Sequence, residues 1–463
     1  MRSAELGVDC RHFQRLRRRR DEGEDPMTST RPSRAEKVDA ATPASRNRVV
    51  DFLRAAAITV VVLGHWTIIA VDPDGGILPH GVLDGARWTH PLTWLFQVMP
   101  IFFLVGGYSN GLSWRSARRK EIGYAEWLRT RLRRLGIPLI PLLLAWLVIG
   151  VVTVALGAPH ATVQLASQMA LIPTWFLAAY LMVILVGPPC LWLWERFGWW
   201  SIVGGIALAG IVDAISIAAD QPLLGYPNYL LVWAAFHQVG YAWLDGRLSG
   251  IGRRMLLAAI GLVGLVLLVL VGPYPVSMIT AGGDAISNSS PTRVTMAFLG
   301  MLQAGLVLSL ENPLEALLRR PRLWFVTVLV NQRIMTWFLW HLTVMVGLAH
   351  LLLALDARVV LPEPLTGLWW ATRPLWALVL LALTGLVVLV MGRFEDPRAD
   401  DRPAPPVWKP IAAAACIIAA LAVMASVGVV GESGVTWWWP LLPVAGMAVL
   451  GAGGLPVEQE ESC

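Results

Sequence analysis

Long apolar segments recur along almost the whole chain and are separated by shorter polar stretches. The segments lie at about 51–71, 92–112, 136–157, 168–191, 199–217, 229–244, 255–272, 292–311, 334–355, 373–392, 410–430 and 438–455. Most approach the roughly 20 residues that an α-helix needs to cross a bilayer. Their apolar runs are continuous rather than alternating, which argues against membrane β-strands. The pattern therefore predicts an all-α fold, a polytopic bundle of transmembrane helices.

Charged and proline-rich stretches divide this series of apolar segments. Residues 1–48 are charged, rich in Ser, Pro and Thr, and lack an apolar face, so we expect a disordered basic cytoplasmic tail. Residues 393–409 are charged and proline-rich, which predicts a cytoplasmic linker. This linker separates a ten-span core at 49–392 from a two-helix transmembrane hairpin at 410–455. A short cytoplasmic tail is expected at 456–463.

The composition agrees with a membrane protein and argues against several kinds of site. Hydrophobic residues make up 56% of the chain and charged residues 15%, and the mean hydropathy is +0.60. A soluble protein of 463 residues needs a more polar surface than this. The four cysteines show no paired spacing, which indicates neither a disulfide framework nor a zinc site. No set of His, Cys, Asp or Glu has metal-ligand spacing, so we expect no bound metal.

Basic residues are distributed unevenly between the loops. They gather in alternate loops, at 113–135, 245–254, 312–333 and 393–409. Because basic loops face the cytoplasm, this asymmetry predicts a cytoplasmic N-terminus. Arginine far outnumbers lysine, which suggests a bacterial gene, and we expect a multi-pass protein of the bacterial inner (plasma) membrane. The net charge of +6 and the basic run at 15–20 then indicate contact with membrane lipids, not with nucleic acid.

The first apolar segment contains two ionisable side chains, Arg54 and His65. They are eleven residues apart, and at about 100° and about 1.5 Å per residue they fall on one stripe of a helix, about 16 Å apart. Lipid penalises both groups, so the stripe is expected to face the protein interior or a wet cavity. A guanidinium near one membrane face and an imidazole farther along indicate a site that holds an anion and moves a proton.

Further motifs follow this pair along the chain. They are Pro100–Tyr108 (PIFFLVGGY), Arg131–Pro138 (RLRRLGIP), Trp175–Leu177 (WFL) and Trp337–His341 (WFLWH). With the Arg-x10-His spacing, they resemble acyltransferase family 3, membrane proteins that O-acylate glycans and other small or lipid-linked acceptors. The corresponding family patterns are FFxxSGF, RxxRLxPP, WFL and YLWH. The resemblance covers residues 49–392 in order and implies a ten-helix acyltransferase core.

The sequence departs from the family patterns at three positions. Gly106 and Tyr108 stand where the family usually has Ser and Phe, so no hydroxyl at position 106 can assist. Leu139 follows Pro138 in place of a second proline, which changes the start of the third span.

The resemblance implies catalytic roles for the pair on the first segment. An unperturbed imidazole has a pKa of about 6.5, so His65 can take a proton from an attacking hydroxyl near neutral pH. The alternative is transient acylation of His65 itself. Arg54 is implied to grip the phosphates of acyl-CoA together with Arg131 and Arg134. Both side chains also have structural alternatives, an interhelical hydrogen bond for the histidine and a surface-seeking chain for the arginine.

Other polar and aromatic residues are candidates for contact with substrate. Tyr108, Trp175 and His341 complete the predicted substrate-binding set, although Trp175 is more typical of helix packing or of an interfacial aromatic. His341 is either a packing histidine or a second site residue. Asp213 and His237 are polar groups within predicted spans and therefore candidates as well.

Together these features predict a membrane O-acyltransferase. It would move an acyl group, with acetyl the leading candidate, from cytoplasmic acyl-CoA to a hydroxyl of a glycan, glycolipid or small molecule. The donor would be a co-substrate, and no bound cofactor is expected. Two alternatives stay open, a twelve-span secondary transporter and a non-catalytic member that binds a lipid or another ligand.

Overall fold

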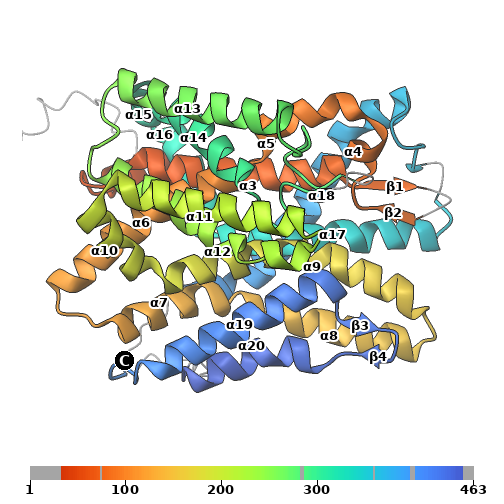
Figure 1. Cartoon of the computed structure of the whole chain (residues 1–463). Helices are drawn as coiled ribbons and strands as arrows, with labels where there is room; N and C mark the ends of the chain where they lie inside the picture. The colour runs from red at the N-terminus through yellow and green to blue at the C-terminus, as the bar shows by residue number, and fades with distance from the viewer. Residues whose placement is uncertain (1–32, 73–75, 282–285, 358–359, 397–401, 452–463) are drawn as a thin grey trace, which may run out of the picture.

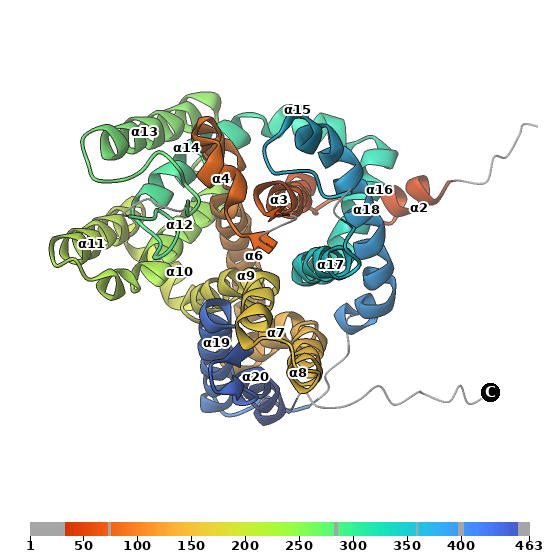
Figure 2. The same ribbon diagram turned by 90° about the vertical axis from the view of Figure 1, so that its right-hand side faces the viewer.

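The computed structural model describes residues 33–72, 76–281, 286–357, 360–396 and 402–451, and this part of the chain is largely helical. Most of the long helices run side by side along one direction, and a view along that direction shows them end-on (Figures 1 and 2). The described strands form two short antiparallel pairs, β1 (Ala70–Asp72) with β2 (Gly76–Leu78), and β3 (Val430–Gly431) with β4 (Gly434–Val435). The predicted all-α polytopic bundle is confirmed.

Eight of the described helices are long and apolar enough to cross a membrane. They are α3 (Arg48–Ile68), α6 (Met99–Arg119), α9 (His160–Leu185), α11 (Trp199–Ala218), α13 (Ile251–Leu270), α17 (Ile334–Ala354), α18 (Gly367–Met391) and α19 (Trp408–Val427). Two bent pairs raise the count within the described ranges to as many as ten. The chain is thus a multi-pass membrane protein.

The bent pairs break at recognisable places. In the first pair, α7 (Tyr124–Gly136) meets α8 (Leu139–Ala155) at 43°, and Pro138 lies between them. Proline lacks a backbone N–H and ends a regular helix, so the bend is expected there. In the second pair, α14 (Thr295–Ser309) meets α15 (Glu311–Leu318) at 53°.

Shorter elements precede, connect and follow these helices. The shorter helices are α2 (Arg34–Ala40), α4 (Gly81–Gly85), α5 (Thr93–Phe96), α10 (Gly187–Phe197), α12 (Asn228–Leu244), α16 (Pro321–Gln332) and α20 (Trp438–Val449). The 3-10 turns are η1 (Arg87–Leu92), η2 (Pro222–Gly225) and η4 (Gly392–Glu395).

Glycines bring α6 and α12 into direct backbone contact. A Cβ atom on Gly107 would overlap the carbonyl oxygen of His237, and one on Gly240 would overlap the carbonyl oxygen of Leu104. Small residues allow this kind of close approach between membrane helices. The second glycine of the PIFFLVGGY motif therefore serves packing of the two helices.

Part of the stretch for which composition predicts no structure is ordered. A reciprocal capping box between Ser33 and Glu36 starts α2. The segment after α2 is held by Trp324 of α16, whose indole nitrogen donates to the Thr42 hydroxyl at 2.7 Å. The guanidinium of Arg48 lies 4.8 Å from the same indole ring. Residues 1–32, the rest of the predicted tail, lie outside the described residues, as does 456–463.

The start of the predicted linker also belongs to the helical core. Glu395 in η4 accepts hydrogen bonds from the backbone N–H groups of Met335 and Thr336, both at 3.0 Å. These N–H groups begin α17 and have no partner inside the helix, so a carboxylate there caps the helix and opposes its dipole. Composition alone missed this role because a cap acts through tertiary contact. Residues 397–401 of the linker lie outside the described residues.

The C-terminal hairpin of α19 and α20 packs beside α7, α8 and α9, as both views show (Figures 1 and 2). Its turn is bonded to α9, because the N–H of Val429 donates to the Ser167 hydroxyl at 3.0 Å and the Gln168 amide donates to the Ser426 carbonyl at 2.7 Å. The hairpin is thus attached to the bundle by specific polar contacts as well as apolar packing.

Two further contacts attach the linker and hairpin to α7. Arg129 donates to the carbonyl oxygens of Pro403 and Arg402 at 2.8 and 2.9 Å. Gly136, at the end of α7, faces Met447 of α20, and a Cβ atom on the glycine would lie 2.7 Å from the methionine sulfur. The C-terminal part of the chain therefore braces the short helix that carries Arg131 and Arg134.

Replacing Arg129 by Gln should destabilise the fold by about 1–3 kcal/mol, because the buried guanidinium group and its two hydrogen bonds to the linker are lost. The measurement is the melting temperature of the purified full-length protein in one detergent. Arg119→Gln is the matched control, since Arg119 is exposed at the end of α6. Equal melting temperatures for the two variants would show that the contact between α7 and the linker is unimportant for stability.

Candidate active site

Arg54 borders a small cavity enclosed by α3, α6, α7, α9 and α17. The cavity has a volume of about 150 Å³, and its lining includes Arg131 and Arg134 of α7. Ser109 and Tyr180 add hydroxyl groups, and most other lining side chains are apolar. Three of the arginines expected at the site thus share one cavity.

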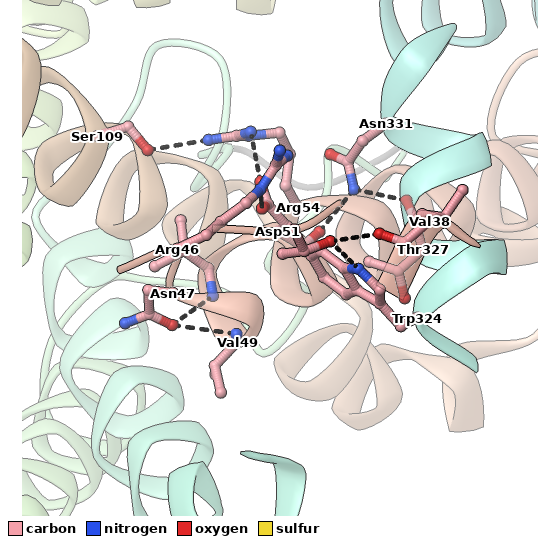
Figure 3. Close-up of polar contacts among 12 residues, drawn as sticks. Val38, Arg46, Asn47, Val49, Asp51, Arg54, Ser109, Trp324, Thr327 and Asn331 are labelled. Carbon is pink, nitrogen blue, oxygen red and sulfur yellow. Dashed lines mark hydrogen bonds and ion pairs between the residues drawn. The ribbon is translucent and has the colours of Figure 1, made fainter. Parts of the chain in front are cut away.

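The guanidinium of Arg54 is held in a fixed network (Figure 3). It lies 3.3 Å from the Asp51 carboxylate, one helical turn away, and donates to the Ser109 hydroxyl at 2.9 Å. Arg46 binds the other oxygen of the same carboxylate at 2.6 Å. The Asn331 amide donates to the backbone carbonyl of Asp51 at 2.8 Å, which joins this part of α3 to α16. Asp51 therefore orients Arg54 without entering the cavity.

The cavity has a positive character. Arg131 and Arg134 are three residues apart on α7, which places them on the same face of the helix. The Arg131 guanidinium lies 5.7 Å from the ring of Trp127, which restricts its orientation. Among the described residues that line the cavity, none is an aspartate or glutamate. Such a lining favours an anionic ligand, because guanidinium groups bind phosphate and carboxylate oxygens through paired donors.

His65 is hydrogen bonded to His341 across the interface of α3 and α17. The Nδ1 atom of His65 and the Nε2 atom of His341 are 2.8 Å apart, and the two rings are within 6° of parallel. The Nδ1 atom of His341 lies 2.8 Å from the carbonyl oxygen of Phe338. His341 is fully buried, whereas His65 is partly accessible. Trp66 strengthens the same interface by donating to the carbonyl oxygen of His341 at 3.2 Å.

These contacts determine where the protons lie in the neutral pair. A carbonyl oxygen only accepts, so Nδ1 of His341 must carry a proton that it donates to Phe338. Neutral His341 then has its lone pair on Nε2, which accepts from the Nδ1–H group of His65. The remaining nitrogen of His65, Nε2, is left unprotonated. The partly accessible histidine therefore presents a proton acceptor, and the buried histidine holds its tautomer.

The arginine cavity and the histidine pair are neighbours rather than one space. His65 is not among the residues that line the cavity. Phe338 lies between the two, since its side chain lines the cavity and its carbonyl group binds His341. The phenyl ring of Phe338 is centred 6.4 Å from the His341 ring. The stripe of α3 from Arg54 to His65 thus runs from the arginine cavity to the neighbouring histidine pair.

Two of the predicted substrate-binding residues lie elsewhere. The Tyr108 hydroxyl accepts a hydrogen bond from the Asn47 amide at 3.3 Å, and its ring lies 4.7 Å from that of Trp243. The ring of Trp175 packs against Phe176 and Tyr229. Neither residue lines the arginine cavity, and both make helix-packing contacts.

The other polar groups within spans have structural partners. Asp213 is completely buried and forms an ion pair with Arg293 at 3.2 Å. It also accepts hydrogen bonds from the Asn228 amide at 2.7 Å and the Val294 N–H at 2.8 Å. These bonds fasten the connection between α13 and α14 to α11 and α12. His237 is buried behind Asn110, with 3.2 Å between the Asn110 amide nitrogen and the ring nitrogen Nε2.

Sequence reasoning missed Ser109, Asn110 and Tyr180, which all line the cavity. The sequence could have indicated them, because each is a polar residue inside an otherwise apolar segment and polar groups within membrane spans are candidates for functional sites. Tyr180 also explains the glycine at position 106. A Cβ atom on Gly106 would lie 2.8 Å from Cε2 of the Tyr180 ring, so the tyrosine fills the space that a serine side chain would need.

The described ranges contain no cluster of three or more His, Cys, Asp or Glu side chains that could hold a metal ion.

Comparison with known protein families gives one match. A family model described as an acyltransferase domain covers residues 47–393, from the start of α3 to η4. No curated protein and no solved structure matches the chain. The matched range contains the arginine cavity and the histidine pair, and it ends before the C-terminal hairpin.

The contact between positions 106 and 180 can be tested by a double-mutant cycle. Gly106→Ala should destabilise the protein by about 1–3 kcal/mol, because the added methyl group overlaps the Tyr180 ring. In a Tyr180→Ala background the same change should cost less. The measurement is again the melting temperature of the purified protein. Gly204→Ala on α11 is the control, since a Cβ atom there meets nothing within 4 Å. Additive effects would contradict the proposed overlap.

Proposed function

Because this chain belongs to acyltransferase family 3, we propose that it is a membrane O-acyltransferase that uses acyl-CoA as donor. The acceptor is a hydroxyl group of a glycan, a glycolipid or a metabolite, and acetyl is the leading candidate for the transferred group. The observation that carries the proposal is the hydrogen bond between His65 and His341, which leaves Nε2 of His65 as a proton acceptor.

The arginine cavity suits the phosphates of coenzyme A. Arg54, Arg131 and Arg134 supply guanidinium groups to a space whose described lining residues include no acidic side chain. Coenzyme A carries its phosphates and its sulfur at opposite ends of an extended arm. A phosphate site set apart from the reacting histidine is therefore what this donor requires, and the axial distance from Arg54 to His65 is about 16 Å.

The reaction follows from the proton positions in the histidine pair. The acceptor hydroxyl attacks the thioester carbonyl while its proton moves to Nε2 of His65. The resulting imidazolium is stabilised by the hydrogen bond from its Nδ1–H group to His341. Collapse of the tetrahedral intermediate breaks the carbon–sulfur bond, and the thiolate takes the proton from Nε2. His341 acts as a positioning residue in this scheme, in the way that a third group orients the base in other acyl-transfer sites.

The orientation of the bundle follows from the location of the donor. Acyl-CoA is a cytoplasmic metabolite, so the end of α3 that carries Arg54 would face the cytoplasm. The basic loops at 113–135 and 312–333 lie at the corresponding ends of their helices, which supports the same orientation. We accordingly place the protein in the inner membrane with its N-terminus in the cytoplasm. Hydroxyl acceptors would then reach His65 from the membrane face opposite to the one on which Arg54 lies.

Replacing His65 by Ala should reduce acyl transfer by about 10²–10⁴-fold, the usual contribution of a general base. The assay measures release of the coenzyme A thiol from acetyl-CoA by membranes that contain the protein and its native acceptors. His350→Ala is a matched control, because His350 lies on the same helix as His341, α17, and its ring bonds to the Val346 carbonyl of that helix at 2.9 Å. Activity that survives in the His65 variant would exclude this histidine as base or nucleophile.

Arg131→Gln and Arg134→Gln should weaken binding of coenzyme A by roughly 10–100-fold, as expected for lost hydrogen bonds to a charged group. Calorimetry with free coenzyme A measures this effect independently of the acceptor. Arg119→Gln serves as control. Unchanged affinity in both variants would show that the cavity is not the donor site, and solute uptake by vesicles without thioester cleavage would favour a transporter.

A further inference from the structure

A second and larger cavity opens on the surface of the bundle that faces the lipid. It is a groove of about 800 Å³ between α3, α16, α17 and α18. Its walls are mainly apolar and include Val62, Leu63, Leu329, Leu381 and Leu386. It shares only Ile58 with the arginine cavity among the described lining residues, so it is a separate site.

The outer rim of the groove is open. Leu386 is 61% exposed and Leu389 is 81% exposed, although both belong to the membrane-spanning helix α18. Leucines exposed on a membrane helix contact lipid tails. The groove is therefore open to the hydrocarbon layer rather than to water.

The length of the groove matches one leaflet. Along α3 the lining extends from Ile58 to Trp66, and along α18 from Leu381 to Leu389, about 12 Å in each case. Half of a bilayer core is about 15 Å thick. A lipid tail that enters at the charged end, beside Leu389, would therefore extend as far as Leu381 on α18 and Trp66 on α3.

The charged side chains of the groove lie together at one end. They are Arg333, Arg393 and Asp396, which follow α16 and α18. Asn331 joins this end of α16 to Asp51 on α3, so the charged end of the groove is on the same side of the membrane as Arg54. A lipid head group belongs at this depth.

Arg393 is the group that is available at this end. Arg333 is occupied, because it pairs with Asp396 and donates to the Gly392 carbonyl at 2.7 Å. The exposed guanidinium of Arg393 lies 5.1 Å from the Phe394 ring and has no hydrogen-bond acceptor within the described ranges. Of the two carboxylates at this end, Asp396 pairs with Arg333 and Glu395 accepts from the first N–H groups of α17, so Arg393 remains the charged group that can pair with a phosphate.

We propose that this groove binds one anionic phospholipid from the leaflet on the Arg54 side, with an acyl chain along the leucines and its phosphate at Arg393. The bound chain would pack against α3 and α17, the two helices that carry the histidine pair. The proposal does not depend on the acyltransferase reaction, since it concerns binding of a bulk membrane lipid.

Two variants separate the head-group contact from the acyl-chain contact. Arg393→Gln removes the positive charge and leaves the apolar walls unchanged. Gly385→Leu fills the groove, because a side chain there points toward Trp337, whose nearest atom is 3.9 Å from an added Cβ atom. The matched controls are Arg253→Gln on α13, on the other side of the bundle (Figure 2), and Gly347→Leu, where an added Cβ atom meets nothing within 4 Å.

The experiment is native mass spectrometry of the full-length protein released from vesicles of equal parts phosphatidylglycerol and phosphatidylcholine. The wild-type protein and both controls should retain one more phosphatidylglycerol molecule than Arg393→Gln and Gly385→Leu retain. Equal retention by all five proteins would overturn the proposal. Preferential retention of phosphatidylcholine, whose head group also carries a phosphate but has no net charge, would overturn the choice of an anionic lipid. Thioester cleavage is measured in a separate assay, so failure of the lipid-binding proposal can be distinguished from failure of the proposed acyltransferase function.

Discussion

The hydrogen-bonded series from His65 through His341 to the Phe338 carbonyl is the constraint on which the site depends. In a helical membrane protein, a polar side chain within a span needs a partner supplied by the protein. Here a backbone carbonyl fixes the proton on one imidazole, and that imidazole fixes the proton on the next. The same contacts join α3 to α17, so the chemical state of His65 and the packing of two helices are set together. A change in either affects the other.

The arginines of the cavity are likewise held in place by contacts with other parts of the protein. Asp51 binds both Arg46 and Arg54, and therefore lowers the cost of placing two guanidinium groups close together. Arg131 and Arg134 come from α7, a short helix set at an angle to α8 and supported by the linker through Arg129. The positive cavity is thus assembled from elements whose positions are maintained by contacts outside it. The C-terminal hairpin also contacts α7, through Met447 against Gly136, although the family match ends before that hairpin begins.

Much of the architecture was predictable because one physical requirement dominates it. A bilayer demands long apolar helices, and these appear directly as apolar segments in the sequence. The helical spacing of Arg54 and His65 likewise predicted a shared stripe. The partners of these residues could not be predicted in the same way, because the contact of His65 with His341 joins positions that are 276 residues apart. The cap formed by Glu395 and the ordered α2 were hidden for the same reason, because local composition carries no information about tertiary hydrogen bonds.

The cap on α17 also has a practical consequence for how the protein can be divided. Helix α17, which carries His341, begins at two N–H groups that hydrogen bond to Glu395, a residue about sixty positions farther along the chain. Composition suggests cutting the chain after residue 392, at the last apolar position of α18. A fragment that ends there would lack Glu395 and leave the N–H groups of Met335 and of the buried Thr336 without their partner. The smallest autonomous unit must therefore extend past Asp396, and natural fusions or domain exchanges would be tolerated only beyond that point.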